Sequence, residues 1–504
     1  MVKQKPKYTQ TENVTLFSEE QGKPMRLHAE SIQKLFEKSG DVVVRPIQVG
    51  TLEAFLFCVD GLIDSATIGE QIFKPLATDE RLQQAVDETQ AVELLLDGAA
   101  HFPFVTKETD VNKVITSVLS GLTAILFNQI ETAVLVDARG FEKRSIGEPT
   151  DENVIKGAKD CFVEVIRVNT ATIRRKIKSP NLVIEESVAG KMSLTNIALV
   201  YLEGTTNRHI LKEVRRRLQK MNIDGIMTTG YLEESLAEKP FSVFPQLLYT
   251  ERPDKFCSHI MDGRVGLLID GLPTAYILPA SVTMFMQAPE DYSNNYIFSS
   301  VIRLLRYFCL VVSLLLPGFY IAITTFHQEM IPTELAFSIQ KAKMDVPFPS
   351  FVEILGMLIA FEILMEAGLK LPKTIGQAVS IVGALVVGQA AVEAKIISPA
   401  VVIVIAFTGV CGFTMPNQDF SHAVRLWRFL FTVAGSLAGL FGVMILLIFL
   451  LLELCSIQNL GAPYLEPLSD SISSHIKDTL LRPPFRYLNW RPFSVRPINI
   501  RRQK

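Results

Sequence analysis

The chain has 504 residues, of which 48% are hydrophobic and 20% are charged, and its mean hydropathy is +0.28. It is too hydrophobic on average for a soluble enzyme and too charged for a chain made only of membrane helices, so we expect a soluble part and a membrane part. The 50 Lys and Arg nearly balance the 52 Asp and Glu, which gives no overall field that would attract nucleic acid or an acidic substrate.

The N-terminal segment and the cysteines lack the patterns of a signal peptide and of a metal site. Residues 1–29 are polar and lack the apolar core of a signal peptide, so they are predicted to form a disordered tail, and the long N-terminal region is predicted to stay in the cytoplasm. The six cysteines are scattered, without a Cys-X-X-Cys pair or a histidine at ligand spacing. We therefore expect reduced, mostly buried thiols, no metal site and no cofactor.

The region up to residue 295 alternates short β-branched runs with charged amphipathic stretches, which predicts an α/β fold. Within it, "GLTAILFNQIETAVLVDA" (121–138) aligns with "GRVGLLIDGLPTAYILPA" (263–280) at an offset of 142 residues, and "FCVDGLID" aligns with "VYLEGTTN" at an offset of 143. These two matches predict a cytoplasmic α/β region built from two duplicated subdomains, 30–150 and 185–295.

The segment between the two copies, 151–184, is predicted to be a helical connector that ends before Pro180. It carries three consecutive basic residues, Arg174, Arg175 and Lys176. These bases form either a solvated helix face or a contact with anionic lipid head groups or a partner.

Residues 296–456 are predicted to form an α-helical, multi-span membrane domain. A spanning helix needs about 20 apolar residues, and four segments meet this requirement: 307–326, 374–392, 396–416 and 429–452. A fifth segment, 351–367, carries acids and is predicted to be an amphipathic or re-entrant helix.

The last segment, 457–504, is rich in arginine and is predicted to be a basic cytoplasmic tail under the positive-inside rule. With both ends of the chain on the cytoplasmic side, the number of crossings is even, and we expect four. The segment 422–428 would then be a loop on the outer side, in spite of its two arginines.

Three glutamates in the segment 351–367 need separate interpretations. Ser350 and Glu353 have the spacing of a capping box. Glu366 lies one turn before a helix-ending Gly and Pro and can reach water. Glu362 lies among apolar neighbours, where a charge at membrane depth costs about 2.5–3.5 kcal/mol on insertion scales. Glu362 and Glu366 share one helix face, which is either a solvated face or one that meets water, a cation or another subunit within the membrane.

The segment 374–392 has a stripe of small residues. Gly376, Ser380, Gly383, Val387 and Ala391 fall within about 80° of one another on a helical wheel. Small residues at this spacing commonly serve close helix packing, and the alternative is that the stripe lines a pore in an oligomer. Together with Glu362 and Glu366, these five residues are the candidate pore or gate.

Eight motifs occur in one order along the chain: "FVEVIRVNTATIRRKI", "FPQLLYTERPDK", "GRVGLLIDG", "QAPEDY", "FHQEMIPTELA", "VPFPSFVEIL", "FEILMEAGLKLP" and "IGQAVSIVGALVVGQAAVEA". In this order they resemble the A subunits of the GerA-type spore germinant receptors. The resemblance covers 52–484. Two departures are that Leu358, Ile359 and Ala360 stand where the family often has an acid followed by Val-Thr, and Met365 stands where it often has Arg.

The resemblance implies a subunit of a complex in the inner membrane of a dormant spore, with the N-terminal domain and the tail on the core side. The expected partners are a transporter-like B subunit that binds the nutrient and a lipoprotein C subunit. The A subunit is expected to oligomerise and to conduct monovalent cations once nutrient is sensed. By this analogy, Glu362 and Gly383 match positions in the membrane region of the family.

Two other functions remain open at this point, and a third is not expected. An accessory paralogue that amplifies ion release shares the membrane motifs. A secondary transporter would show inverted repeats with many spans, which four spans and a soluble duplication fit poorly. An enzyme is not expected, because the chain has no P-loop, no GxGxxG after a strand, no HExxH and no GxSxG, and its histidines are isolated.

Overall fold

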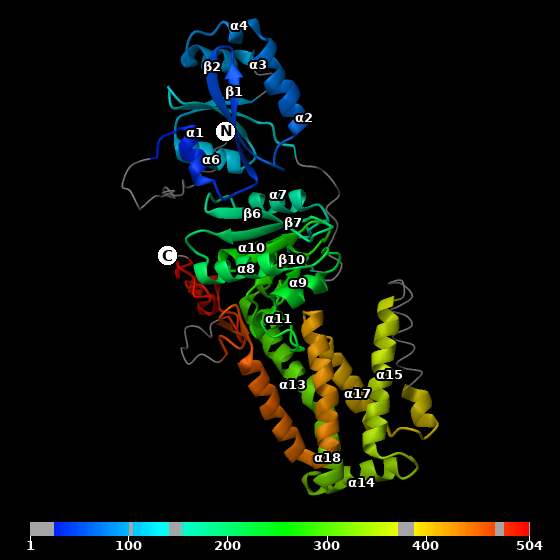
Figure 1. The fold of residues 1–504 in the computed structure, drawn as a ribbon. Helices are drawn as coiled ribbons and strands as arrows, with labels where there is room; N and C mark the ends of the chain where they lie inside the picture. Colours follow the sequence, from blue (N-terminus) through cyan, green and yellow to red (C-terminus); the bar gives the residue numbers. More distant parts are fainter. Residues whose placement is uncertain are drawn as a thin grey trace, which may run out of the picture.

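The structure is a computed structural model and describes residues 25–99, 104–140, 152, 154, 156–370, 388–468 and 478–502. Two α/β units and a helical bundle follow one another along the chain, and the C-terminal segment returns to the second α/β unit (Figure 1). The predicted tail 1–29 lies outside the described residues as far as residue 24. Residues 25–29 belong to the first unit, since Leu27 is buried and a helix begins at Ala29.

The first unit is a five-stranded antiparallel sheet with the strand order β1-β2-β4-β5-β3. Its strands are β1 (Val42–Val49), β2 (Leu52–Val59), β3 (Val105–Glu108), β4 (Thr123–Phe127) and β5 (Thr132–Val136). Its helices are α1 (Ala29–Leu35), α2 (Ser65–Ile68), α3 (Lys74–Thr78), α4 (Glu80–Gln83), α5 (Glu88–Leu94) and α6 (Val111–Leu119), with π-helical segments η1 (Gly69–Phe73) and η2 (Leu95–Ala99).

The second unit repeats this plan with the antiparallel order β6-β7-β9-β10-β8. Its strands are β6 (Leu182–Ala189), β7 (Thr195–Leu202), β8 (Leu248–Thr250), β9 (Val265–Ile269) and β10 (Ala275–Leu278). Its helices are α7 (Ile166–Lys176), α8 (Arg208–Lys220), α9 (Thr229–Leu236), α10 (Pro253–Met261), α11 (Val282–Met286) and α12 (Glu290–Ser293). The shared strand order agrees with the predicted duplication.

Turns at matching positions explain why the repeat is visible in the sequence. Gly61 and Gly204, which are 143 residues apart, follow β2 and β7 with φ angles of +79° and +76°. Gly121 and Gly263, 142 residues apart, precede β4 and β9 with φ angles of +100° and +93°. Side chains other than glycine rarely adopt these angles, so the two copies keep glycine at the same turns.

The predicted connector 151–184 is only partly correct. The helix in it is α7, and Leu182–Ile184 already form the start of β6, where they pair with β7 and are buried in the second unit. Neither interpretation of the basic triplet holds for Arg174, which is fully buried and donates to both carboxylate oxygens of Asp41, at 2.7 and 2.9 Å. This ion pair joins α7 to the segment before β1.

The bundle contains α13 (Tyr296–Phe326), α14 (Thr333–Lys343), α15 (Ser350–Lys370), α17 (Pro399–Gly412) and α18 (Gln418–Ser456), with a 3-10 turn η3 (Gln328–Met330) after α13. By length and composition, α13 and α18 are the two described helices long and apolar enough to cross a membrane. The predicted outer loop 422–428 is wrong, because these residues lie within α18, whose start is capped by the side chain of Asn417.

Helix α18 doubles back on itself. A straight helix of 39 residues would be about 58 Å long, yet residues near its two ends contact the same segment. The Phe420 ring lies 6.0 Å from that of Phe244, and Glu453 accepts a hydrogen bond from Ser242. The reversal is at Ala438 and Gly439, whose backbone angles are not helical, and Figure 1 shows the two arms meeting at this bend.

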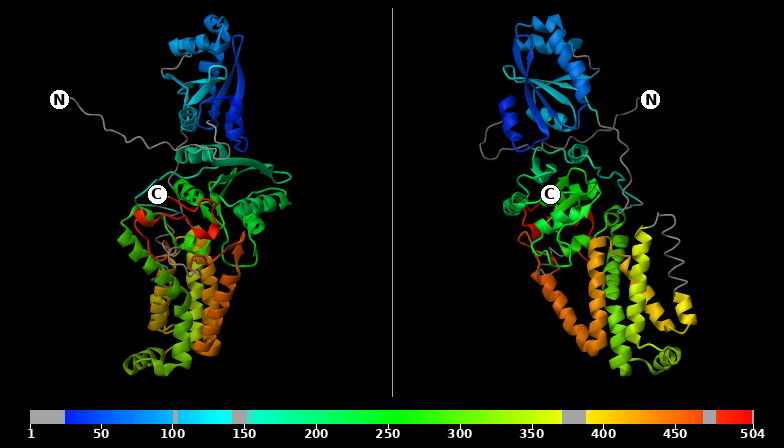
Figure 2. Two further views of the ribbon diagram at one scale, coloured as in Figure 1. Left: turned by 90° about the vertical axis from the view of Figure 1, so that its left-hand side faces the viewer. Right: turned by 45° about the vertical axis from the view of Figure 1, so that its right-hand side comes forward.

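The other predicted membrane segments agree with the observed helices to different degrees. The segment 307–326 lies in α13, which begins eleven residues earlier. The segment 396–416 yields the 14-residue α17, shorter than a spanning helix needs. The segment 351–367 lies in α15, whose Ile354 and Leu358 are buried against the bundle, and Figure 2 shows α15 running alongside its neighbours. Of 374–392, only residues from 388 onward are described, so four crossings stay a prediction.

The C-terminal segment packs on the second unit. It forms a small hairpin of β11 (Gln458–Asn459) and β12 (Ala462–Pro463) and two 3-10 turns, η4 (Phe485–Tyr487) and η5 (Phe493–Val495). Tyr464 donates a 2.8 Å hydrogen bond to the Pro245 carbonyl, and the Arg491 guanidinium donates one of 2.8 Å to the Met261 carbonyl. The predicted basic tail is therefore fixed to the α/β region by some of its own bases.

Helices α13 and α18 approach closely where each carries a glycine. A Cβ atom added at Gly435 would collide with the carbonyl oxygen of Gly318, and one added at Gly318 would collide with the carbonyl oxygen of Phe431. We expect Gly435→Ala to destabilise the full chain by about 1–3 kcal/mol, because the backbones would have to separate. The measurement is the midpoint of thermal unfolding in detergent.

The matched control is Gly356→Ala in α15, where an added Cβ would meet nothing within 4 Å. This change should leave the midpoint unchanged or raise it slightly, since Ala is the better helix former. Equal effects of the two substitutions would contradict the close packing of α13 on α18.

Candidate functional site

Two groups of charged side chains stand out in the part of the chain that the structure describes. The first lies inside the bundle. Glu362 of α15 accepts a hydrogen bond of 3.2 Å from Arg425 of α18, and the two side chains are 27% and 19% exposed. The other carboxylate oxygen of Glu362 is buried without a hydrogen-bond partner among the described residues. The predicted isolation of Glu362 is thus only partial, because Arg425, the eighth residue of α18, faces it.

Arg428 lies one turn after Arg425 on α18 and is buried. Its guanidinium donates to the hydroxyl of Ser313 on α13 at 3.2 Å. Among the described residues, no carboxylate oxygen lies within 4.0 Å of it, and its Nε has no hydrogen-bond partner. We call Glu362, Arg425 and Arg428 the bundle charge cluster. It contains two cations and one anion between three apolar helices.

The other predicted pore residues do not join this cluster. Glu366 is exposed and pairs with Lys370 on the same helix at 2.8 Å. Ala391 is half-buried, and its carbonyl accepts the hydrogen bonds that end the helical turn 388–393. Four candidates, Gly376, Ser380, Gly383 and Val387, lie outside the described residues. The neighbouring Gly388 is buried, and a Cβ atom added to it would lie 3.5 Å from Val402 of α17, an ordinary packing distance.

Glu353 has a different role from the predicted capping box. Its carboxylate accepts a 2.8 Å hydrogen bond from the backbone N–H of Ser398, directly before α17, and lies 3.8 Å from the Lys343 ammonium. Ser350 instead accepts a hydrogen bond from Lys343. Glu353 therefore joins α15 to the start of α17, where a carboxylate is favoured by the helix dipole.

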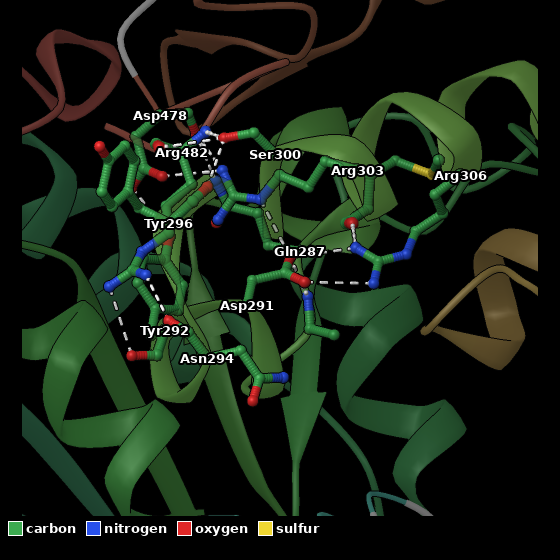
Figure 3. Close-up of polar contacts among 12 residues, drawn as sticks. Gln287, Asp291, Tyr292, Asn294, Tyr296, Ser300, Arg303, Arg306, Asp478 and Arg482 are labelled. Atoms are coloured by element: carbon green, nitrogen blue, oxygen red, sulfur yellow. Dashed lines mark hydrogen bonds and ion pairs between the residues drawn. The ribbon is translucent and has the colours of Figure 1, made fainter. Parts of the chain in front are cut away.

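The second group lies at the start of α13, where the second α/β unit, the bundle and the C-terminal segment meet (Figure 3). Arg303 is fully buried and pairs with Asp291 at 2.9 Å and with Asp478 at 2.8 Å. Arg306, one turn later, donates to Asp291 at 3.0 Å and to the Met286 carbonyl at 2.6 Å. One arginine thus connects α12, α13 and the C-terminal segment.

Further polar contacts complete this group. Tyr292 donates its hydroxyl hydrogen to Asp478 at 2.8 Å, and Gln287 donates to the Asp478 carbonyl at 2.8 Å. Arg482 donates to the Asn294 carbonyl at 2.8 Å, and its guanidinium lies 5.7 Å from the centre of the Tyr292 ring. We call Asp291, Arg303, Arg306, Asp478 and Arg482 the junction cluster.

Burying the charged groups of the junction cluster costs free energy unless each charge has a partner. Burial raises the pKa of Asp478 above its usual value, and the charge of Arg303 opposes that rise. Burial also raises the pKa of Tyr292, which stays protonated and serves as a hydrogen-bond donor. Buried charges of this kind are tolerated only when each has partners, so removing one partner should cost more than removing an exposed ion pair.

The sequence contained signals for this cluster that its interpretation did not use. Asp291 lies in the motif "QAPEDY", and Arg303 and Arg306 stand three residues apart at the start of the first apolar helix. Arg482 was predicted only as one base of a cytoplasmic tail. The pairing of these residues depends on Asp478, which is 175 residues from Arg303 in the chain, and local spacing cannot predict such a contact.

The described residues contain no group of three His, Cys, Asp or Glu side chains placed to hold a metal ion. All six cysteines are free in the structure, and Cys58, Cys257, Cys309 and Cys411 are buried, which agrees with the prediction that most of the thiols are buried.

Comparison with known proteins identifies the family. Residues 30–494 match the family model described as Bacillus/Clostridium GerA spore germination protein. The chain therefore belongs to the GerA family of spore germination proteins, and the resemblance inferred from its motifs is confirmed. Membership of this family gives it a role in spore germination.

Two relatives known by sequence agree with this assignment. The chain is 39% identical over 460 residues to spore germination protein KA of Bacillus subtilis (strain 168), covering 91% of this chain and 84% of that protein. It is 35% identical over 452 residues to spore germination protein B1 of the same strain, covering 90% and 92%. The crystal structure of the N-terminal domain of the A subunit of the Bacillus megaterium spore germinant receptor GerK3 is 27% identical, with a TM-score of 0.40 and coverage of 49% of this chain and 92% of that one.

The junction cluster predicts a large effect of a small change. Asp291→Asn keeps the shape of the side chain but leaves Arg303 and Arg306 without this carboxylate, and we expect it to destabilise the chain by about 3–5 kcal/mol. Asp345→Asn serves as the control, because Asp345 forms an exposed ion pair with Lys395 at 2.6 Å. Chemical denaturation of both variants in detergent measures the difference, and similar losses would show that the junction cluster stabilises no more than a surface pair.

Proposed function

We propose that this chain is the A subunit of a nutrient germinant receptor and forms an oligomeric channel that releases monovalent cations when nutrient is sensed. The observation that carries the proposal is the bundle charge cluster. Ionisable side chains between apolar helices are costly at membrane depth and usually mark ion pathways, relays or switches. Glu362, with a buried oxygen that no described group satisfies, is the carboxylate that a cation would meet.

A location in the spore inner membrane fits the surface of the bundle. Helices α13 and α18 expose many large apolar side chains, among them Phe298, Leu305 and Phe308 on α13 and Leu437, Phe441 and Phe449 on α18. Such a surface favours contact with lipid or with other subunits. In this proposal the N-terminal region and the C-terminal segment lie on one side of the membrane, the side of the spore core, and the return of α18 to the second α/β unit supports this orientation.

The pore in this proposal is lined by the small residues of 374–392 from neighbouring subunits. Gly376, Gly383 and Ala391 give a narrow, smooth wall, and Ser380 gives a polar contact. Cation selectivity requires the Glu362 carboxylate to face the pore in the open state, since in the described arrangement it is paired with Arg425. The association of subunits through this segment is part of the proposal.

Gating requires a partner in this proposal, because the nutrient is bound by a transporter-like B subunit, with a lipoprotein C subunit completing the receptor. Binding to the partner shifts the channel between closed and open states by a few kcal/mol of differential affinity. The junction cluster links the α/β units to α13 and is the route by which a movement of those units reaches the bundle.

The test is potassium release from spores after addition of a mixture of amino acids, sugars and nucleosides. Glu362→Gln removes the charge facing Arg425, and Gly383→Leu places a bulky side chain in the proposed pore wall. Both should slow or abolish release while immunoblots show normal amounts of the subunit, because the conduction path has lost its charge or its width.

The control is Asp345→Asn, which lies outside the candidate pore residues and breaks only the exposed ion pair with Lys395, and it should release potassium as the wild type does. Normal release from both Glu362→Gln and Gly383→Leu spores would contradict the channel. Loss of the Gly383→Leu subunit from the membrane would assign the small-residue stripe to packing and leave Glu362 as the residue that decides the question.

A further inference from the structure

A cavity of about 370 Å³ lies where the second α/β unit meets the C-terminal segment. On one side its wall is formed by α10 and the segment 281–293, and on the other by residues 478–502. Among the described residues, none from the bundle helices α13 to α18 lines it. Its volume lies within the range typical of small-molecule sites.

Arg264, directly before β9, lines this cavity and is 3% exposed. Its guanidinium donates to the Pro279 carbonyl and, at 3.4 Å, to the hydroxyl of Ser494. Its Nε has no hydrogen-bond partner in the described parts of the chain, and no described carboxylate oxygen lies within 4.0 Å of the guanidinium. Burial lowers the pKa of Arg264 to about 10, which still leaves it charged at neutral pH.

The carboxylates that line the cavity are already paired with other cations. Asp262 pairs with Arg502 at 3.1 Å, Asp254 with Arg252 at 2.7 Å, and Asp478 with Arg303 in the junction cluster. The positive charges around the cavity affect His259. Its pKa is lowered by burial and by the nearby charges of Arg264, Lys255 and Arg502. Asp262 and Glu466 act on Arg264 through their charge, and they offset only part of the positive charge at the cavity wall.

The chemistry of the remaining wall suits an anion that carries a small organic body. Ser281 and Thr283 are buried, and their hydroxyls face one another at 3.2 Å on the cavity wall, so each has capacity for a further contact. Tyr487, Leu488 and Trp490 form an apolar side on the C-terminal segment. Arginine guanidinium matches carboxylate and phosphate groups with two parallel hydrogen bonds.

We propose that this cavity binds a small anion, a carboxylate or a phosphate, on the guanidinium of Arg264, with Ser281 and Thr283 as further contacts. The bound anion gives a direct partner to a buried cation that has no carboxylate oxygen within 4.0 Å among the described residues. It also lies between β9 and the C-terminal segment that Ser494 holds, so it tightens the attachment of that segment. The site is separate from the bundle charge cluster and does not depend on channel activity.

The test uses the full chain in phosphatidylcholine nanodiscs, titrated with sodium phosphate or with sodium acetate at an ionic strength held constant with sodium chloride. Thermal unfolding and calorimetry measure binding. We expect a saturable rise of the unfolding midpoint with at least one of the two anions. Arg264→Gln should weaken binding by tenfold or more, whereas Arg215→Gln, which breaks the Glu185 ion pair outside the cavity, should leave it unchanged.

A second variant keeps the test decisive if Arg264→Gln fails to fold. Ser258→Leu retains Arg264 but fills the cavity from α10, and it should also abolish saturable binding. A parallel series in nanodiscs containing phosphatidylglycerol distinguishes free phosphate from a lipid head group. If the unfolding midpoint rises only in these discs, and the rise is lost in Arg264→Gln and Ser258→Leu, the site binds a lipid head group. Absence of saturable binding in every series, or equal binding by the wild type and Ser258→Leu, would overturn the proposal.

Discussion

The ion pairs of Arg303 with Asp291 and Asp478 hold together α12, α13 and the C-terminal segment. The arrangement of the chain beyond the first α/β unit depends on this connection. The arginine is fully buried, and its two acids come from α12 and from the C-terminal segment. A buried charge is stable only while its partners remain, so these three segments cannot separate without exposing or orphaning charge. The junction cluster therefore fixes where the first helix of the bundle leaves the α/β region.

The apolar packing next to the junction cluster also connects the second α/β unit to the bundle. One continuous core contains β6 and β7 side chains of the second unit together with Phe420, Trp427 and Phe431 of α18. Phe244, from the α/β region, lies against both Phe420 and Trp427, with ring centroids 6.0 and 6.4 Å apart. Because the second unit and the bundle share this core, a movement of one is transmitted to the other through packed side chains. The two arginines of the bundle charge cluster lie on α18, the helix that takes part in this core.

The sequence predicted the α/β region better than the bundle, for physical reasons. The duplicated unit was visible because its turns need glycine at fixed positions, Gly61 and Gly204 among them, and its strands need β-branched runs. Arg174 was misinterpreted because its partner, Asp41, is 133 residues away and no local pattern predicts such a contact. The reversal in α18 was missed because the uncharged apolar segment 429–452 has the length and composition of a single spanning helix. Its sequence does not indicate that Gly439 turns the chain. Glu362 was singled out from its neighbours alone, whereas its partner Arg425 was assigned to a loop.

The most direct test of this account uses the two tryptophans of the chain. Trp427 lies in the bundle against Phe431, and Trp490 lies in the C-terminal segment beside Arg501. In Trp490→Phe, fluorescence reports unfolding of the bundle, and in Trp427→Phe it reports release of the C-terminal segment from the second unit. If the junction cluster and the shared core make one body, the two variants should unfold in denaturant with the same midpoint. Two well-separated midpoints would show that the bundle and the α/β region are independent, which would contradict the account.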